Sequence, residues 1–330
     1  MPKVLIATEK PFAADAVQKI KTELENAGYN YSFLENYTEK SALHNALADA
    51  EALIVRSDII DEAAFNAAPK LKIVVRAGAG YDNIDLKSAT AHNVVVMNTP
   101  GQNSNAVAEL AIGMMIYMAR NKFNGKSGTE LAGKTLTLYG FGWVARYVAK
   151  IAKGIGMDVY AYDPFISDEV IQKEGVKPKQ ISALRYSWCI SDEVIQKEGV
   201  KPLHSVEDIF KLGDYISLHI PATEDTKKSV NWNLLSLVKD DAILVNTARK
   251  EVIEEDALLK AFAEKKKFRY VSDVAPDNSA KLLELYPDRV FFTPKKMGAQ
   301  TSEANTNAGI AAAKQIIAYF EKGDVKYKVN

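Results

Sequence analysis

The sequence predicts an α/β fold with two parallel sheets, and three observations carry that prediction. Short β-rich runs alternate with helical patterns along the whole chain, as in parallel strands joined by crossover helices. One stretch reads as strand, glycine turn, helix and strand, and the length of 330 residues suits two domains. The expected strands are KVLIAT, EALIVR, KIVVRAG and VVVMN before that stretch, and YISLHI, AILVNTA, YVSDVA and VFFTP after it.

The amino-acid composition limits the kinds of binding partner that the protein can have. The 42 basic and 42 acidic residues cancel, so no global field attracts nucleic acid or an anionic membrane. The single Cys189 excludes an internal disulfide framework and any multi-cysteine metal site, and we expect no metal. The first residues enter a strand without a signal-peptide pattern, and the apolar run at 111–118 is too short to span a bilayer. We therefore expect a cytoplasmic protein with a small-molecule substrate.

The strand, turn and helix at residues 138–163 predict a dinucleotide site of the Rossmann type. Gly140 allows the tight turn, Gly142 lets the backbone approach a pyrophosphate, and Ala145 is the third small position. The pyrophosphate would sit on the helix N-terminus. Asp163, about 20 residues on, accepts hydrogen bonds from a ribose and repels a 2′-phosphate, which favours NAD over NADP. The alternative is a glycine turn of some other α/β fold.

Two long helices are expected outside this unit. We interpret the helix near residues 104–120 as a core helix between domains and a candidate dimer surface, with methionines that pack. Its apolar face contains Val107, Leu110, Ala111, Met114, Met115 and Met118. The last helix begins at Ser302 and ends before Gly323.

A duplication interrupts the pattern. ISDEVIQKEGVKP occurs at residues 166–178 and again, letter for letter, at 190–202. We interpret residues 179–202 as an insertion that the fold survives, because loop-closure entropy rises slowly with length. One copy docks after the Asp163 strand, before a helix capped by Ser205 and Asp208. Tyr186 and Trp188 either stack on an adenine or are stray surface aromatics.

Several ordered motifs give the chain a family resemblance. The glycine unit, LHIPAT, LVNTARKEVI, SDVAPDN and TPKKMGAQTSEA together resemble the D-2-hydroxyacid dehydrogenases. RAGAGYDNIDL and NTPGQNSNAVAELA resemble the branch that acts on 3-phospho-D-glycerate. The resemblance implies a substrate-binding domain at 1–98 and 299–330, hinged to an NAD-binding domain at 99–298, with the active-site cleft between them. It also implies a homodimer without the regulatory domains of longer relatives.

The same resemblance assigns site residues. Arg249, at the end of a strand, would hold the substrate carboxylate, which suits its planar fork; a structural salt bridge is the alternative. Arg56 and Arg76 are candidates for the substrate phosphate or are solvated surface groups. Further substrate contacts are expected from the anion nest at Ala77, Gly78, Ala79 and Gly80, and from Asn103 and Lys295. Cofactor contacts are expected from Gly140, Gly142, Trp143, Val144, Asp163, His219, Pro221, Thr226, Thr247, Ala248 and Asp273.

The sequence departs from the family at the catalytic pair. Lys296 stands where members carry a histidine, and Asp277 or Asn278 stands where they carry a glutamate. A carboxylate beside a lysine would raise its reference pKa of about 10.4 further. A lysine works as a base when either burial or neighbouring cations lower its pKa, and Lys295, Lys250 and Arg249 are the candidate cations. We assign Lys296 as base and Asp277 as the remaining acid. The alternative is that Lys295 and Lys296 grip phosphate.

The expected activity is NAD-dependent oxidation of 3-phospho-D-glycerate to 3-phosphohydroxypyruvate, which the resemblance places at the first step of serine biosynthesis. A glyoxylate or hydroxypyruvate reductase, or another D-2-hydroxyacid dehydrogenase, is the second enzyme hypothesis, and it needs no phosphate site. An NAD-sensing corepressor and a scaffold inactivated by the insertion are the alternatives of another class.

Overall fold

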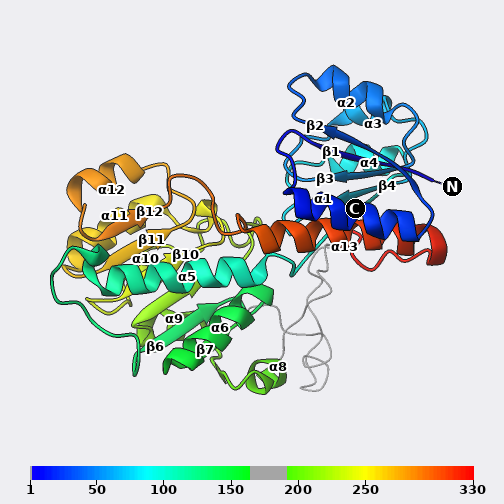
Figure 1. The fold of residues 1–330 in the computed structure, drawn as a ribbon. Helices are drawn as coiled ribbons and strands as arrows, with labels where there is room; N and C mark the ends of the chain where they lie inside the picture. The colour runs from blue at the N-terminus through cyan, green and yellow to red at the C-terminus, as the bar shows by residue number, and fades with distance from the viewer. Residues whose placement is uncertain (1, 164–191) are drawn as a thin grey trace, which may run out of the picture. The chain divides into compact units, whose positions relative to one another are not determined.

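The computed structural model describes residues 2–163 and 192–330 and divides the chain into two compact units (Figure 1). Unit 1 comprises Met1–Ser104 and Ala299–Asn330, and unit 2 comprises Asn105–Gly298. Each unit has one parallel sheet with helices on both faces. The predicted α/β fold with two parallel sheets is therefore confirmed.

Unit 1 contains a five-stranded sheet in the order β2-β1-β3-β4-β5, the flavodoxin-like order. Its strands are β1 Lys3–Thr8, β2 Asn30–Glu35, β3 Ala52–Val55, β4 Ile73–Arg76 and β5 Val95–Asn98. Its helices are α1 Ala14–Asn26, α2 Lys40–Leu47, α3 Glu62–Asn66, α4 Leu86–Ala91 and α13 Ser302–Lys322. The run that forms β2 is absent from the expected strands, because its side chains are only half-buried at the sheet edge.

Alternation along the strands builds two cores in unit 1. Val4 and Ile6 of β1 face α1 and α13, whereas Leu5 and Ala7 face the opposite helices. Helix α13, in orange to red beside the blue α1 in Figure 1, approaches α1 closely. A Cβ at Gly309 of α13 would lie 2.6 Å from a side-chain carbon of α1, so the two helices pack closely there. Helix α13 thus belongs to the core of unit 1.

Unit 2 contains a seven-stranded sheet in the order β12-β11-β10-β9-β6-β7-β8, again with parallel pairing. The strands are β6 Thr135–Tyr139, β7 Asp158–Tyr162, β8 Lys201–Pro202, β9 Tyr215–Leu218, β10 Ile243–Asn246, β11 Arg269–Ser272 and β12 Val290–Phe292. The helices are α5 Ser104–Ala119, α6 Trp143–Ile155, α8 Asp192–Lys197, α9 Val206–Leu212, α10 Trp232–Leu235, α11 Glu255–Glu264 and α12 Ser279–Leu285. Short 3₁₀ turns lie at Asn121–Phe123 and Lys250–Val252.

The helices of unit 2 bury their apolar faces on the two sides of the sheet. Helices α5, α6 and α8 share one core with β6 and β7, and α9 to α12 share the other. The expected apolar face of α5 is confirmed, since Met114, Met115 and Met118 are buried in the first core. These methionines pack, as expected.

The second copy of the duplicated segment lies at the edge of this sheet. Its residues form α8 and then β8, which pairs with β7. Ile195 and Val200 are 2% and 3% exposed, so this copy is docked. The first copy, Tyr186, Trp188 and Cys189 lie outside the described residues.

Three local expectations can be compared with the structure. Ser205 caps α9 by accepting a hydrogen bond from the Asp208 N–H at 3.2 Å, and Gly323 ends α13 in the left-handed conformation, φ +64°. Helix α13 begins at Ser302, as expected, and its N-cap is Thr301, whose hydroxyl accepts from the Ala304 N–H. Residues 99–104 lie with unit 1, where the Thr99 N–H donates to the carbonyl of Gly78.

Candidate active site

The chain of unit 2 reverses its order between β6 and β9, and open parallel sheets bind ligands at the carboxyl ends of strands at such a point. Gly140 directly follows β6 with φ +87°, a conformation that side chains disfavour. A Cβ at Gly140 would lie 2.9 Å from the carbonyl oxygen of His219, which follows β9. Both the turn and the close approach of the two strand ends therefore require glycine.

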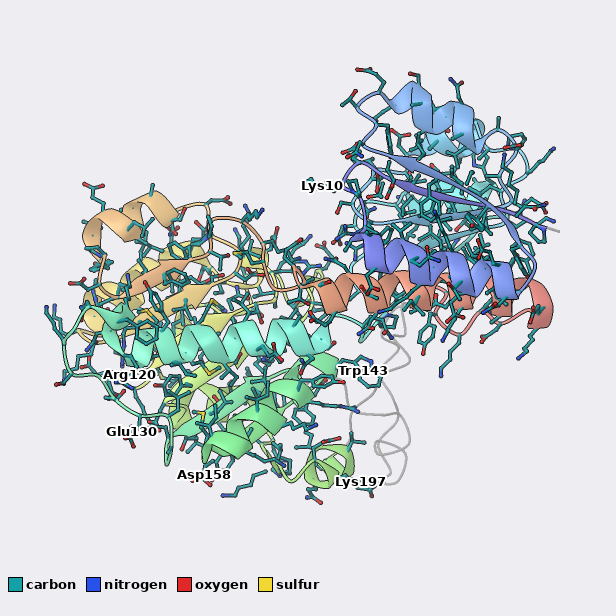
Figure 2. The ribbon with its side chains drawn as sticks, in the orientation of Figure 1. Lys10, Arg120, Glu130, Trp143, Asp158 and Lys197 are labelled. Carbon is teal, nitrogen blue, oxygen red and sulfur yellow. The ribbon has the colours of Figure 1, made fainter. Side chains whose placement is uncertain are left out.

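Helix α6 begins at this turn. Gly142 is its N-cap and supplies no side-chain hydrogen bond, and a Cβ at Gly142 would meet no heavy atom within 4 Å. Trp143, labelled in Figure 2, is 45% exposed at the first position of the helix. Val144 packs against the core instead. An open, uncapped helix start with its positive dipole end is suited to a phosphate group.

Asp163 is tied to the same turn. Its carboxylate accepts a hydrogen bond from the Phe141 N–H at 2.7 Å, and the carbonyl of Tyr162 accepts one from the Gly140 N–H at 2.8 Å. The acid expected to contact the ribose therefore also fixes the backbone of the glycine turn.

Two buried polar atoms near the strand ends have no partner among the described residues. Nε2 of His219 is one, and burial lowers the pKa of this imidazole to about 3, so it is neutral. The hydroxyl of Thr247, after the neighbouring β10, is the other. Buried polar groups normally have partners, so these atoms together with the open helix start fit a polar ligand such as a dinucleotide.

The loop after β9 is fixed by Thr226. Its hydroxyl donates to the carbonyl of Pro221 and accepts from the Thr223 N–H at 2.7 Å. Pro221 and Thr226 thus shape the segment after His219.

Asn246 shapes the turn that presents Arg249. Its side-chain oxygen accepts from the Ala248 N–H at 2.9 Å, and its side-chain nitrogen donates to the Arg249 carbonyl at 2.9 Å. Asn246 is 1% exposed, so the turn is anchored from inside the sheet. The guanidinium of Arg249 donates back to the carbonyl of Ala248 at 3.0 Å.

Asp277 forms an ion pair with Lys250. Its N–H, like that of Asn278, donates to the Glu255 carboxylate, at 2.7 and 2.9 Å. The hydrogen bond to Asp277 raises the pKa of the half-buried Lys250. The charge expected of Lys250 as an electrostatic neighbour of Lys296 is therefore offset by Asp277.

Asp273 holds the turn that contains Lys296. It follows β11, is 1% exposed, and accepts hydrogen bonds from the N–H groups of Met297 and Gly298 at 2.7 and 2.8 Å. The hydroxyl of Thr293 lies 3.0 Å from the same carboxylate. Lys295 is exposed. The expected cofactor residue Asp273 is thus engaged with the loop of the expected base.

In unit 1, Arg56 follows β3 at the switch point between β1 and β3. Its guanidinium donates to the carbonyls of Lys10 (labelled in Figure 2) and Pro11, at 3.2 and 3.3 Å, and to the side chain of Asn305. It lies over the ring of Phe12, 5.1 Å from the centroid. Burial lowers the pKa of Arg56.

Arg76 closes β4 beside this group. Its Nε donates to the backbone carbonyl of Arg56 at 2.8 Å, and its guanidinium covers Gly78, where a Cβ would lie 1.4 Å from Nη1. Gly78 has φ +154°, and Asn98 donates to the Ala79 carbonyl at 2.6 Å. These bonds hold residues 77–80 as a turn.

Asn103 lies in the turn before α5. The expected residues form four local groups: Gly140 with His219 and Asp163, Thr247 to Arg249, Asp273 with the Lys296 turn, and Arg56 with Arg76. Sequence reasoning missed Asn246, Glu255 and the buried Asp58, which accepts from Tyr37 and the Glu9 N–H. A polar residue at the end of an apolar strand was the only signal for Asn246.

Comparison with known proteins shows the family to which the chain belongs. The model of the D-isomer specific 2-hydroxyacid dehydrogenase catalytic domain matches residues 5–330. The chain therefore belongs to this family of NAD-dependent dehydrogenases. Within the part of the chain that the structure describes, no cluster of three or more His, Cys, Asp or Glu side chains suits a metal ion. None of the described helices is long and apolar enough to cross a membrane.

Individual relatives narrow the comparison. The chain is 35% identical over 299 residues to a D-3-phosphoglycerate dehydrogenase of Methanocaldococcus jannaschii, covering 84% of this chain and 51% of that protein. It is 33% identical over 325 residues to a hydroxypyruvate reductase of Thermotoga maritima, covering 92% and 95%. The crystal structure of NAD+-bound 3-phosphoglycerate dehydrogenase from Entamoeba histolytica matches with a TM-score of 0.82 and 41% identity, covering 100% and 98%. The chain spans about half the length of the curated D-3-phosphoglycerate dehydrogenases it matches.

Proposed function

We propose that the chain is an NAD-dependent dehydrogenase that oxidises 3-phospho-D-glycerate to 3-phosphohydroxypyruvate. The observation that carries the proposal is the glycine turn of unit 2, where an open helix start, Asp163 and the unpartnered Nε2 of His219 lie at the switch point. The unpartnered hydroxyl of Thr247 follows the neighbouring strand β10. The names of the Methanocaldococcus and Entamoeba relatives support the substrate.

The cofactor roles are based on this geometry. The start of α6, with Gly140, Gly142 and Trp143, binds the pyrophosphate, and Asp163 binds the adenosine ribose. The remaining proposed cofactor residues are Val144, His219, Pro221, Thr226, Thr247, Ala248 and Asp273. Bound NAD is the two-electron acceptor of the reaction.

The substrate roles are divided between the units. Arg249 of unit 2 binds the carboxylate of the substrate in a bidentate manner, because its backbone is fixed by Asn246. We assign the phosphate to Arg56 and Arg76 of unit 1, which close the neighbouring strands β3 and β4 and are joined by the bond from Arg76 Nε to the Arg56 carbonyl. The turn at residues 77–80, Asn103 and Lys295 complete the proposed substrate contacts. Unit 1, residues 1–104 and 299–330, is thus the proposed substrate-binding domain, and unit 2, residues 105–298, the proposed NAD-binding domain.

Lys296 is the proposed base. As the substrate is oxidised, the proton of its C2 hydroxyl passes to the neutral amine of Lys296, and the C2–H bond breaks with its hydride going to bound NAD, so that C2 becomes a carbonyl. Asp277 is the proposed supporting acid, and it acts through Lys250, with which its carboxylate forms an ion pair.

Kinetics with matched substrates test the proposal. The specificity constant for 3-phospho-D-glycerate should exceed that for D-glycerate by about 100-fold or more, because a phosphate held by arginines contributes charge-assisted hydrogen bonds. NAD should be preferred over NADP because of Asp163. Equal activity with the unphosphorylated acid would favour the second candidate, a hydroxypyruvate reductase such as the Thermotoga relative.

A homodimer in the cytoplasm is also proposed. Ile116 of α5 and Phe123 just after it are 37% and 66% exposed, and such apolar side chains suit a contact between copies. Light scattering after gel filtration should give twice the chain mass of 36.3 kDa.

A further inference from the structure

The carboxylate of Asp273 is almost fully engaged inside unit 2. Oδ1 accepts from the Met297 N–H at 2.7 Å and lies 3.0 Å from the Thr293 hydroxyl. Oδ2 accepts from the Gly298 N–H at 2.8 Å. Asp273 is 1% exposed, so these bonds are shielded from solvent and stronger than surface ones.

The backbone of Asp273 is fixed as well. It directly follows β11, and its N–H donates to the Asn246 carbonyl at 3.0 Å. The carboxylate therefore lies at the carboxyl end of β11, next to β10, the strand that leads to Arg249.

The turn that receives these bonds has little room to move. A Cβ at Gly298 would lie 3.0 Å from Oδ2 of Asp273 and 3.2 Å from a methyl carbon of Val107 in α5. Two consecutive N–H groups, those of Met297 and Gly298, are thus held between the carboxylate and a helix. Lys296 is the residue immediately before them.

We propose that Asp273 is a positioning residue, which fixes the backbone after Lys296 and thereby the reach of its amine. This inference rests on the proposed function, in which Lys296 is the base. It is additional to the cofactor contact proposed for Asp273, because the three hydrogen bonds within the chain leave Oδ2 able to accept another. Misplacing a reacting group by about 1 Å can cost about 100-fold in rate.

Hydrogen exchange tests the clamp without any turnover. In Asp273→Asn the side-chain amide presents one acceptor oxygen and one donor nitrogen, so one of the two N–H groups loses its partner. The amides of Met297 and Gly298 should exchange about tenfold faster or more. Unchanged exchange of both amides would overturn the clamp.

Steady-state kinetics test the positioning. The kcat for 3-phospho-D-glycerate should fall about 100-fold in Asp273→Asn and in Gly298→Ala, while the NADH dissociation constant of Gly298→Ala stays within about twofold. Faster exchange with an unchanged kcat would overturn the positioning role. A large loss of NADH affinity in Gly298→Ala would overturn it too, because the turn would then act through the cofactor.

Two further variants guard against a simple folding defect. Gly298→Ala keeps the carboxylate but displaces the turn, and it should lower kcat in the same way. Ser272→Ala is the matched control. The hydroxyl of this buried neighbour lies within hydrogen-bond distance of the Asn246 and Val274 carbonyls, to either of which it donates, and it makes no hydrogen bond to the turn. It should lose stability but keep kcat and the exchange rates of Met297 and Gly298. A wild-type chain without activity would refute the proposed function, whereas the exchange experiment would still decide the clamp.

Discussion

The two units place similar glycine-rich turns at the carboxyl ends of parallel strands, yet the two turns lead into different surroundings. In unit 2 the turn after β6 opens directly into the 13-residue helix α6, which has no side-chain cap. In unit 1 the turn after β4 is covered by the guanidinium of Arg76, and the next helix, α4, is capped by Asp85. Glycine spacing alone therefore does not define a phosphate site, because the helix start and its cap decide what the turn can bind.

The largest expected effect concerns the chemistry assigned to unit 2. Lys296→Ala should lower turnover by about 10³-fold in both directions, since a general base contributes about 10²–10⁴-fold. NADH binding should be nearly unchanged. The oxidation rate of the wild type should rise at a more alkaline pH than a histidine base, with its reference pKa of about 6.5, would give.

Lys295→Ala is the matched control and should act mainly on substrate KM. If Lys295→Ala is the more severe variant, the base is Lys295. If neither variant impairs turnover, unit 2 does not supply a lysine base.

The paired glycines sharpen the comparison directly. Gly140→Ala should abolish NADH binding, because a Cβ there meets the His219 carbonyl oxygen at 2.9 Å and φ is +87°. Gly78→Ala meets the flexible end of Arg76 instead, so it should raise substrate KM and leave the NADH dissociation constant unchanged. Fluorescence titration with NADH and substrate kinetics measure the two quantities. Equal loss of NADH affinity in both variants would break the distinction between the turns.

The duplicated segment offers an internal control that only unit 2 carries. Ile195→Ala, in the docked copy, should lower the free energy of unfolding by about 2–4 kcal/mol because it leaves a cavity. The same change at Ile171, the matching position of the first copy, should cost less than about 0.5 kcal/mol. Thermal or urea unfolding measures both. Equal costs would show that the two copies do not differ in how deeply this isoleucine is buried.

The smallest effect is a pH dependence. His219 is held neutral with a pKa of about 3, whereas an unfolded histidine has a pKa of about 6.5. Between these values the unfolded state binds more protons, so stability falls as pH decreases, by at most about 1.4 kcal/mol per pH unit. His219→Asn should lose this part of the dependence between about pH 6.5 and 5. Parallel stability curves for both proteins would show that the imidazole is not held neutral.

Much of the fold could be predicted from local sequence patterns. The glycine unit, the apolar face of α5 and the Ser205 cap arise from patterns within a few residues, and all are observed. Strand β2 was missed, because an edge strand with half-buried side chains lacks a clear alternation.

The candidate site was harder to predict from the sequence, because its side chains interact with residues that are far away along the chain. Lys250 pairs with Asp277, and Asp273 binds the N–H groups of a turn 24 residues later. Such contacts depend on how neighbouring strands align their ends, which periodicity does not reveal. The family resemblance supplied the positions of Arg249 and Lys296, but not the bonds that hold them.

The edge strand β8 has a consequence for how the protein behaves in concentrated solution. It consists of Lys201 and Pro202 only. Proline has no N–H to offer a further strand, and a charged lysine at a sheet edge discourages pairing with another chain. The first copy ends in the same pair, Lys177 and Pro178. The duplication therefore repeated a sequence that ends a sheet rather than one that extends it, and this edge of unit 2 is protected against edge-to-edge aggregation.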